Sequence, residues 1–127
     1  MPRRPPAAVR AARPIRRDDF GPAIPRLSSR TMDAIRRLER ERFHSDAIYH
    51  AVHEWRYSAR TPSYSRCECC DRGFGRGILE IALHALPKRA ARELRGLITP
   101  ADDEYLARNL PDPKMPADLP WWHRHSW

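Results

Sequence analysis

The chain has 127 residues and a mass of 14.8 kDa, and 41% of its residues are apolar and 31% charged. That length fits one small domain and excludes a two-domain enzyme, because a compact domain usually needs on the order of 100 residues. A mean hydropathy of -0.76 and the lack of an uninterrupted apolar run of about 18 residues also exclude a membrane-spanning helix. Thirteen prolines against five glycines, gathered mostly at the two ends, predict a central domain between two extended tails.

The net charge of +8 is concentrated at the start of the chain. Residues 1–30 contain eight arginines and two aspartates, a balance of +6, and the remaining 97 residues carry only +2. A basic arm on a nearly neutral body favours contact with a polyanion such as nucleic acid. Arginine outnumbers lysine 22 to 2, which also favours phosphate binding, but a GC-rich genome produces the same bias, so both interpretations stay open.

Residues 1–27 combine proline, arginine and alanine with few large apolar side chains, so we expect this arm to be disordered when free. The arm lacks the apolar segment of about 7 to 15 residues that marks a secretory signal, and its prolines interrupt the amphipathic helix of a transit peptide. A cytoplasmic location is therefore expected. The arm supplies most of the predicted phosphate contacts, namely Arg3, Arg4, Arg10, Arg13, Arg16 and Arg17.

A helical domain is predicted over residues 28–110. A serine or threonine at position 28, 29 or 31 can cap its first helix, and apolar residues recur at helical spacing as far as Trp55. This pattern predicts either one helix over residues 30–58 or two helices that meet near His44 and Ser45.

Residues 59–77 are expected to form a loop that holds all three cysteines. Thr61-Pro62 begins this loop, and glycines at positions 73, 75 and 77 end it because glycine tolerates positive φ. Arg72 and Arg76 flank these glycines as in Arg/Gly segments that bind RNA, so they join the candidate nucleic-acid contacts. A simple turn role for the glycines explains the same segment.

Cys67 and Cys70 form a Cys-x-x-Cys that is followed by glycines, which resembles a zinc knuckle. A structural zinc ion needs four ligands, and His50 and His53 lie three residues apart on one helix face, where they can supply two nitrogens. The sequence therefore predicts a structural zinc site with these four ligands, in which Cys69 has no assigned role.

The same residues allow other interpretations. The histidines precede the cysteines and stand closer together than in zinc fingers, so reduced thiols packed in the fold, with surface histidines, remain an alternative. A redox Cys-x-x-Cys normally begins a helix on a βαβ sheet, and no strand is predicted here. A cysteine nucleophile has no support beyond the presence of suitable residue types, so we expect neither enzyme activity nor a small-molecule substrate.

Two further helices are predicted after the loop. An apolar stripe that begins at Ile78 is interrupted or restarted by Pro87 and continues to Gly96, a suitable C-cap. Thr99-Pro100 then begins a helix that runs to about residue 109.

Prolines enforce an extended path over residues 111–127, which end in a tryptophan-rich tail. An indole buries about 150–250 Å² when it packs, so we expect Trp121 and Trp122 to be at least half buried near Trp55 and the apolar stripe. Stacking of these rings on nucleobases beside Arg124 is the alternative. Together the elements predict an all-α fold, a small bundle of three to five helices with a Cys/Gly-rich loop and extended proline-rich tails.

The stretch from residue 47 to residue 123 contains four motifs, each present once: Tyr64-Ser65-x-Cys67-x-Cys69-Cys70, Gly73-Phe74-Gly75-Arg76-Gly77, Ala90-Ala91-Arg92-Glu93-Leu94-Arg95 and Leu119-Pro120-Trp121-Trp122. In these motifs the chain resembles a group of small actinobacterial proteins. The resemblance implies a source with a GC-rich genome and a cytoplasmic location. It carries no activity and no site residue over to this chain.

Two functions of different classes fit the sequence. The first is a non-enzymatic basic module that binds nucleic acid or a ribonucleoprotein through its N-terminal arm. The alternative is a protein-interaction module whose helical body and tryptophan tail bind a protein partner, with the arm incidental. Neither function involves a membrane.

Overall fold

The computed structural model describes residues 23–61 and 74–126. Within these residues the chain is a small all-α bundle of four helices, as the sequence predicts. The helices are α2 (Ser29–Arg42), α3 (Ala47–Arg60), α4 (Phe74–Ala85) and α5 (Lys88–Arg108). A short C-terminal tail follows, with β1 (Leu110–Pro111), the 3-10 helix η3 (Trp121–His123) and β2 (His125–Ser126).

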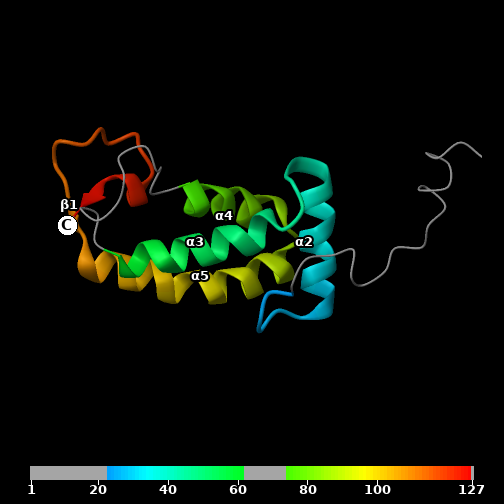
Figure 1. Ribbon diagram of the computed structural model, residues 1–127. Helices are drawn as coiled ribbons and strands as arrows, with labels where there is room; N and C mark the ends of the chain where they lie inside the picture. The colour runs from blue at the N-terminus through cyan, green and yellow to red at the C-terminus, as the bar shows by residue number, and fades with distance from the viewer. Residues whose placement is uncertain (1–22, 62–73, 127) are drawn as a thin grey trace, which may run out of the picture.

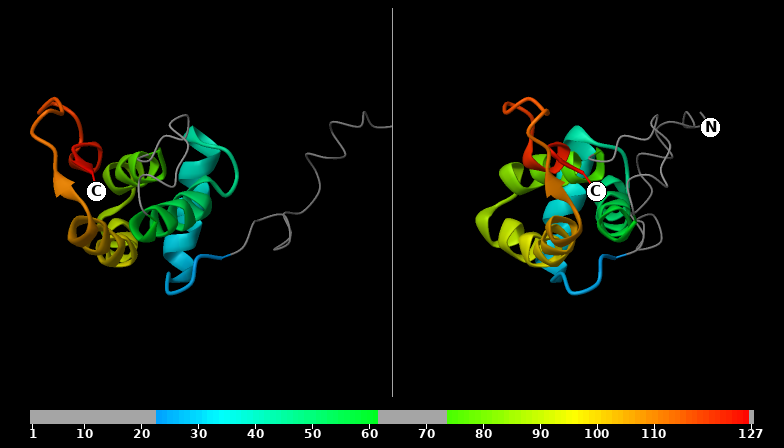
Figure 2. Two further views of the ribbon diagram at one scale, coloured as in Figure 1. Left: turned by 60° about the vertical axis from the view of Figure 1, so that its left-hand side comes forward. Right: turned by 90° about the vertical axis from the view of Figure 1, so that its left-hand side faces the viewer.

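Helices α3, α4 and α5 run alongside one another, α2 crosses them at one end, and the tail folds back at the other end (Figures 1 and 2). The apolar stripes of all four helices meet in one core, where Trp55, Ile48, Leu79 and Leu94 are at most 1% exposed. Burial of these stripes holds the bundle together, since isolated helices as short as α2, α3 and α4, with 12 to 14 residues, are marginal in water.

The first helical segment divides into α2 and α3, which confirms the two-helix alternative. Ser28 is the N-cap of α2, and its hydroxyl oxygen accepts a hydrogen bond from the Thr31 backbone N–H at 3.2 Å. The chain turns at Asp46, which has a φ of 65°. The buried carboxylate of Glu39 accepts a hydrogen bond from the Ile48 N–H at 3.0 Å and so takes the place of a side-chain cap on α3. Burial raises the pKa of Glu39, although this hydrogen bond opposes the shift.

The boundary of the N-terminal arm at residue 27 is wrong. Ile24 is 3% exposed and belongs to the core, and Leu27 packs against it. These two apolar side chains give the segment enough buried surface to order its backbone. The prolines and arginines around them made the segment look like part of the arm in the sequence. The ordered body thus includes residues 23–27.

Helix α4 begins at Phe74 rather than after residue 77, so Gly75 and Gly77 are helical and none of the described glycines has a positive φ. Gly75 has a packing role instead. A Cβ atom at this position would overlap the Glu54 carboxylate and come within 3.0 Å of the Ala51 backbone oxygen. Gly75 therefore permits α4 to approach α3 closely.

Gly75 and Gly77 form a matched pair for a stability test. We expect Gly75→Ala to lower the free energy of unfolding by about 1–3 kcal/mol, because the added methyl group pushes α4 away from α3. A Cβ atom at position 77 would meet no atom of another described element within 4 Å. Gly77→Ala should raise the free energy of unfolding by about 0.5–1 kcal/mol through better helix propensity. Denaturant unfolding measures both, and equal effects of the two substitutions would contradict the close approach at Gly75.

The expected helix end at Gly96 and new start at Thr99-Pro100 are also wrong, because α5 continues through both. Its buried residues continue at helical spacing across the break signals, from Leu94 through Ile98 to Tyr105. A proline inside a helix costs about 3 kcal/mol and a glycine about 1. Burial of this continuous stripe outweighs those local costs.

Candidate nucleic-acid interface

One face of α3 points away from the core and carries basic and aromatic side chains. We call this face the α3 ridge; it consists of His50, His53, Arg56, Tyr57 and Arg60. His50, His53, Tyr57 and Arg60 follow one another at spacings of three or four residues, and Arg56 lies three residues after His53, so the five side chains share the face opposite the buried residues of α3. Tyr57 is 65% exposed, which is unusual for a large aromatic side chain on a body of this size.

Two hollows flank the ridge and share two arginines. One, of about 380 Å³, is lined by His53, Arg56, Tyr57 and Arg60. The other, of about 420 Å³, lies between α3, α5 and the segment before α2, and Arg26, Arg56 and Arg60 line it together with Glu104. Three guanidinium groups and one carboxylate thus border a single hollow, which gives it an excess of positive charge.

The ridge arginines are only loosely held. Arg60 has a side chain that is 70% exposed, and its Nε lies 3.5 Å from the Glu104 carboxylate. Such an exposed pair contributes about 0–1 kcal/mol, so Arg60 can exchange Glu104 for another anion at little cost. Within residues 23–61 and 74–126, Arg56 makes no ion pair.

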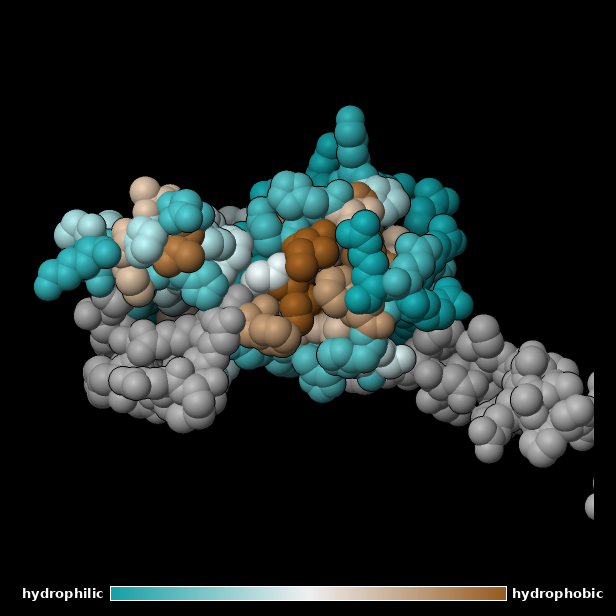
Figure 3. All heavy atoms as spheres, turned by 90° about the horizontal axis from the view of Figure 1, so that it is seen from above, coloured by the Kyte–Doolittle hydropathy of each residue, from teal (hydrophilic) through white to brown (hydrophobic). Residues whose placement is uncertain are grey.

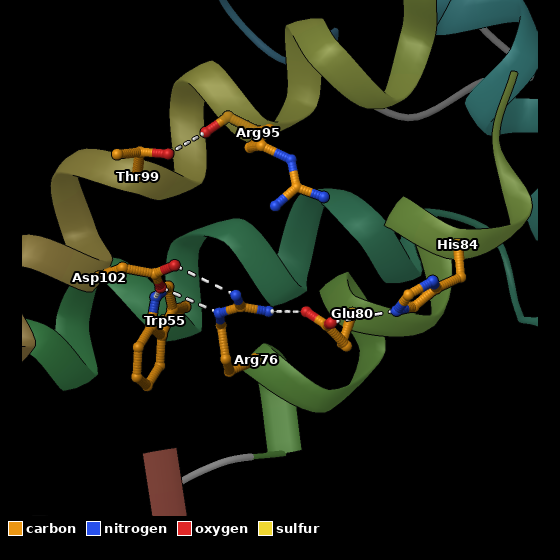
Figure 4. A network of polar contacts seen from close by, with 7 residues as sticks. All are labelled: Trp55, Arg76, Glu80, His84, Arg95, Thr99 and Asp102. Carbon is orange, nitrogen blue, oxygen red and sulfur yellow. Dashed lines mark hydrogen bonds and ion pairs between the residues drawn. The ribbon is translucent and has the colours of Figure 1, made fainter. Parts of the chain in front are cut away.

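Arg76 occupies a different environment, between α3, α4 and α5 (Figure 4). Its Nε and Nη2 donate to the two carboxylate oxygens of Asp102 at 2.9 and 3.1 Å, and its Nη1 donates to Glu80 at 2.7 Å. The Trp55 indole N–H donates to Asp102 at 2.8 Å. The guanidinium carbon also lies 4.9 Å from the centre of the Trp122 ring. Asp102 therefore links α3, α4 and α5 through hydrogen bonds.

The prediction that Arg76 contacts nucleic acid is wrong. Arg76 is 4% exposed, and both of its hydrogen-bonding edges are already paired with carboxylates. Burial alone would lower the pKa of Arg76, but the hydrogen bonds to Asp102 and Glu80 outweigh it and raise the pKa. Likewise burial would raise the pKa of Glu80, but Arg76 outweighs that effect and lowers it. The group is a permanent cation that stabilises the fold.

The tryptophan tail packs onto the body, as the sequence predicts. Trp122 is 7% exposed and belongs to the core. The ring centres of Trp121 and Trp55 lie 6.2 Å apart in an edge-to-face arrangement. The Tyr105 hydroxyl donates to the Trp122 carbonyl at 2.9 Å, and β2 pairs with β1. These contacts bury the Trp122 ring and partly bury the Trp121 ring, so the Trp122 ring is not an exposed stacking surface.

The four predicted zinc ligands are described only in part. His50 and His53 are exposed on the α3 ridge, where the ring of Tyr49 lies 5.4 and 4.4 Å from theirs. Cys67 and Cys70 lie outside the described residues, as does Cys69. In the described ranges no group of three or more metal-ligating side chains gathers. The zinc site stays a prediction.

Metal analysis tests that prediction. Protein purified without chelator should contain about one equivalent of zinc, and a chelator should lower its helicity because a structural metal is coupled to folding. Less than about half an equivalent, with unchanged helicity on chelation, would leave the cysteines as ordinary thiols.

The six arm arginines and Arg72 lie outside the described residues as well, so they also stay predictions. The sequence analysis missed the α3 ridge as a site. Its signal was present in the helical spacing of Arg56, Tyr57 and Arg60 opposite the apolar stripe, but that spacing is also typical of any solvated helix face.

Comparison with known proteins adds no assignment. None of the helices in the described ranges is long and apolar enough to cross a bilayer. No family model, curated protein or solved structure matches this chain.

Proposed function

We propose that the protein is a non-enzymatic module that binds nucleic acid through its basic arm together with the α3 ridge. The observation that carries the proposal is the convergence of Arg26, Arg56 and Arg60 on one hollow of about 420 Å³. The described chain begins at residue 23, and Pro25 and Arg26 line this hollow. The basic residues 1–22 are therefore joined to the body next to its arginine cluster.

Nucleic acid suits this arrangement better than a small anion. Six of the eight net charges lie in residues 1–30, and a cationic segment gains affinity by releasing counterions from the phosphates that it contacts. The hollow beside it offers guanidinium groups, which bind phosphate oxygens in a bidentate manner. The proposal includes nucleic acid that is already part of a ribonucleoprotein. It also includes a cytoplasmic location for the protein.

The ridge arginines can be tested against a matched pair elsewhere. We expect Arg56→Ala combined with Arg60→Ala to weaken binding of a labelled RNA by about 3- to 10-fold at moderate salt, because two phosphate contacts are lost. Arg40→Ala combined with Arg42→Ala removes the same charge from α2, where both side chains are exposed. Fluorescence anisotropy with the full chain measures both double variants.

The comparison separates a site from general charge. If the α2 pair weakens binding as much as the ridge pair, the nucleic acid responds only to net charge and the ridge has no special role. If the full chain binds no RNA and no DNA at low salt, the proposed function is wrong.

A second candidate, a protein-interaction module, is favoured by an apolar stripe on α4. Phe74 is 63% exposed, Ile81 is 46% exposed and Ile78 is half-buried between them. An apolar patch lies over α4 in the space-filling view of the face seen from above (Figure 3). Because Trp122 is buried, the α4 stripe rather than the tryptophan tail supports this candidate.

Self-association is the direct test of the stripe. Sedimentation velocity of the wild type and of Ile81→Lys, at concentrations from about 1 μM upwards, covers the range of weak dimers. A wild-type dimer that becomes monomeric in Ile81→Lys would support protein binding at α4. Two monomers would exclude a second copy of this chain as the protein that covers the α4 stripe.

A further inference from the structure

We infer that the hollow of about 420 Å³ binds the phosphorylated end of a nucleic-acid strand, that is, a terminal phosphate ester rather than an internal phosphodiester. The inference rests on the proposed function and names the part of the strand that meets the body. Three guanidinium groups and the Glu104 carboxylate border the hollow, a balance of +2. A terminal phosphate ester carries a charge of about −1.5 to −2 at pH 7 and three acceptor oxygens, whereas an internal phosphodiester carries about −1. The charge of the hollow therefore matches a terminal phosphate.

The arginines of this hollow are available to a ligand. No ion pair links the side chain of Arg26 or Arg56 to another described residue. The Arg60 side chain is 70% exposed, and its Nε lies 3.5 Å from Glu104. Glu104 also accepts a hydrogen bond from Arg108 at 3.4 Å. Glu104 thus keeps a cationic partner when Arg60 turns to a phosphate.

Two segments of the chain hold these arginines around one space. Arg56 and Arg60 lie one turn apart on α3. Arg26 lies in a turn in which the Leu27 N–H donates to the Ile24 carbonyl at 3.4 Å, and its φ of 70° is in a region that glycine adopts more readily than arginine. Since Ile24 is 3% exposed, the core anchors this turn and so holds Arg26 beside the hollow.

The third wall of the hollow, on α5, suits the nucleotide that carries the phosphate. Gly96 and Pro100 belong to this wall, and Pro100 has no backbone N–H, so the Gly96 carbonyl lacks its usual helical donor. The wall therefore offers an acceptor for a ribose hydroxyl or a base amino group, close to the guanidinium donors. The volume of the hollow is within the range of about 300–1,000 Å³ for ligand pockets, which is larger than a phosphate group needs. Both features favour a nucleotide over inorganic phosphate.

Gly96 permits a variant that fills the hollow without changing any charge. Position 96 is exposed, and a Cβ atom there would meet no atom of another described element within 4 Å. Gly96→Leu therefore places a side chain in the hollow and also favours the helix. Gly77→Leu is the matched control, because a Cβ atom at position 77 on α4 also meets no such atom and Gly77 does not line the hollow.

The probes are one RNA sequence of about 16 nucleotides with an internal label, prepared with a 5′-phosphate, with a 3′-phosphate or with hydroxyl groups at both ends. The full-length wild type should bind a phosphorylated RNA about 3- to 10-fold more tightly than the RNA without a terminal phosphate, because one phosphate meets several exposed guanidinium groups. Comparison of the two phosphorylated RNAs identifies the end that is bound. Gly96→Leu should lose this preference and keep the wild-type affinity for the unphosphorylated RNA, whereas Gly77→Leu should keep the preference.

Three outcomes would overturn the inference. The first is equal affinity of the wild type for all three RNAs, and the second is a preference that remains in Gly96→Leu. The third is displacement of the phosphorylated RNA by an equal concentration of adenosine monophosphate, because the hollow would then bind a free nucleotide rather than the end of a strand. In all three cases the arm and ridge arginines could still bind RNA, so the proposed function would stand. If the wild type bound none of the three RNAs, the proposed function itself would fail.

Discussion

Replacing Arg76 by alanine is expected to lower the free energy of unfolding by about 3–5 kcal/mol, the cost of removing one partner from a buried ion pair. Among the described residues, the substitution leaves Asp102 with one side-chain donor, the Trp55 indole, and Glu80 without its closest cation. It also removes the cation that lies over the Trp122 ring. Since a domain of this size has a total stability of about 5–15 kcal/mol, the variant should be close to unfolding.

Urea unfolding followed by circular dichroism measures this effect, and Arg76→Lys is its control. Lysine keeps the positive charge but loses the paired hydrogen bonds to Asp102, so it should fall between the alanine variant and the wild type. A loss below about 1 kcal/mol in Arg76→Ala would mean that Arg76 is accessible to solvent. In that case its use as a nucleic-acid contact would have to be reconsidered.

Replacing Trp122 by alanine is the second substitution with a large expected effect, about 3–5 kcal/mol, because it empties a large volume in the core. The side chain is 7% exposed and closes the end of the bundle beside Tyr105 and Arg76. Removal of residues 120–127 should cost at least as much, since it also removes Trp121 and strand β2. Thermal melting compares the three proteins.

Trp122→Phe is the matched control for this prediction. In the described part of the chain the Trp122 indole N–H has no hydrogen-bond acceptor. Phenylalanine therefore fills less of the core than tryptophan but breaks no hydrogen bond. The expected loss is about 1 kcal/mol. If the shortened chain melted at the wild-type temperature but bound RNA or a protein less tightly, the tail would be a binding surface rather than part of the core.

Local signals predicted most of the fold correctly. Ser28 is the N-cap, the chain breaks between α2 and α3 near His44 and Ser45, and α5 begins directly after Pro87. These features depend on residues close together in the sequence, whose effect on the backbone is strong enough to survive in the fold. The return of the tail was predictable for a different reason, since two adjacent tryptophans need a large apolar surface.

The wrong predictions share one cause, which is burial that local sequence does not reveal. Gly96 and Thr99-Pro100 are strong break signals, yet the stripe from Leu94 to Tyr105 needs a continuous helix. Ile24 lies among prolines and arginines, yet it reaches the core. In each case contacts between distant elements outweigh a preference of about 1–3 kcal/mol.

Arg76 shows why the candidate site was harder to predict than the fold. In the sequence it belongs to an arginine and glycine segment, as Arg72 does, and nothing nearby indicates its partners. Asp102 is 26 residues away and reaches Arg76 only because α5 runs beside α4. The hollow of about 420 Å³ beside the α3 ridge also depends on how α5 and the segment before α2 pack, so no spacing within α3 predicts it.

The salt dependence of RNA binding tests the central claim most directly. The comparison is between the full chain and a variant with alanine at positions 3, 4, 10, 13, 16 and 17, with a six-lysine variant as the control for charge. Each phosphate contact on a single strand contributes about −0.7 to the slope of log K against log salt, so loss of six contacts should make the slope shallower by about 4. The lysine variant should keep most of the wild-type slope. A slope that is the same in the wild type and in the alanine variant would contradict the account, because the arm would then make no contact with phosphate.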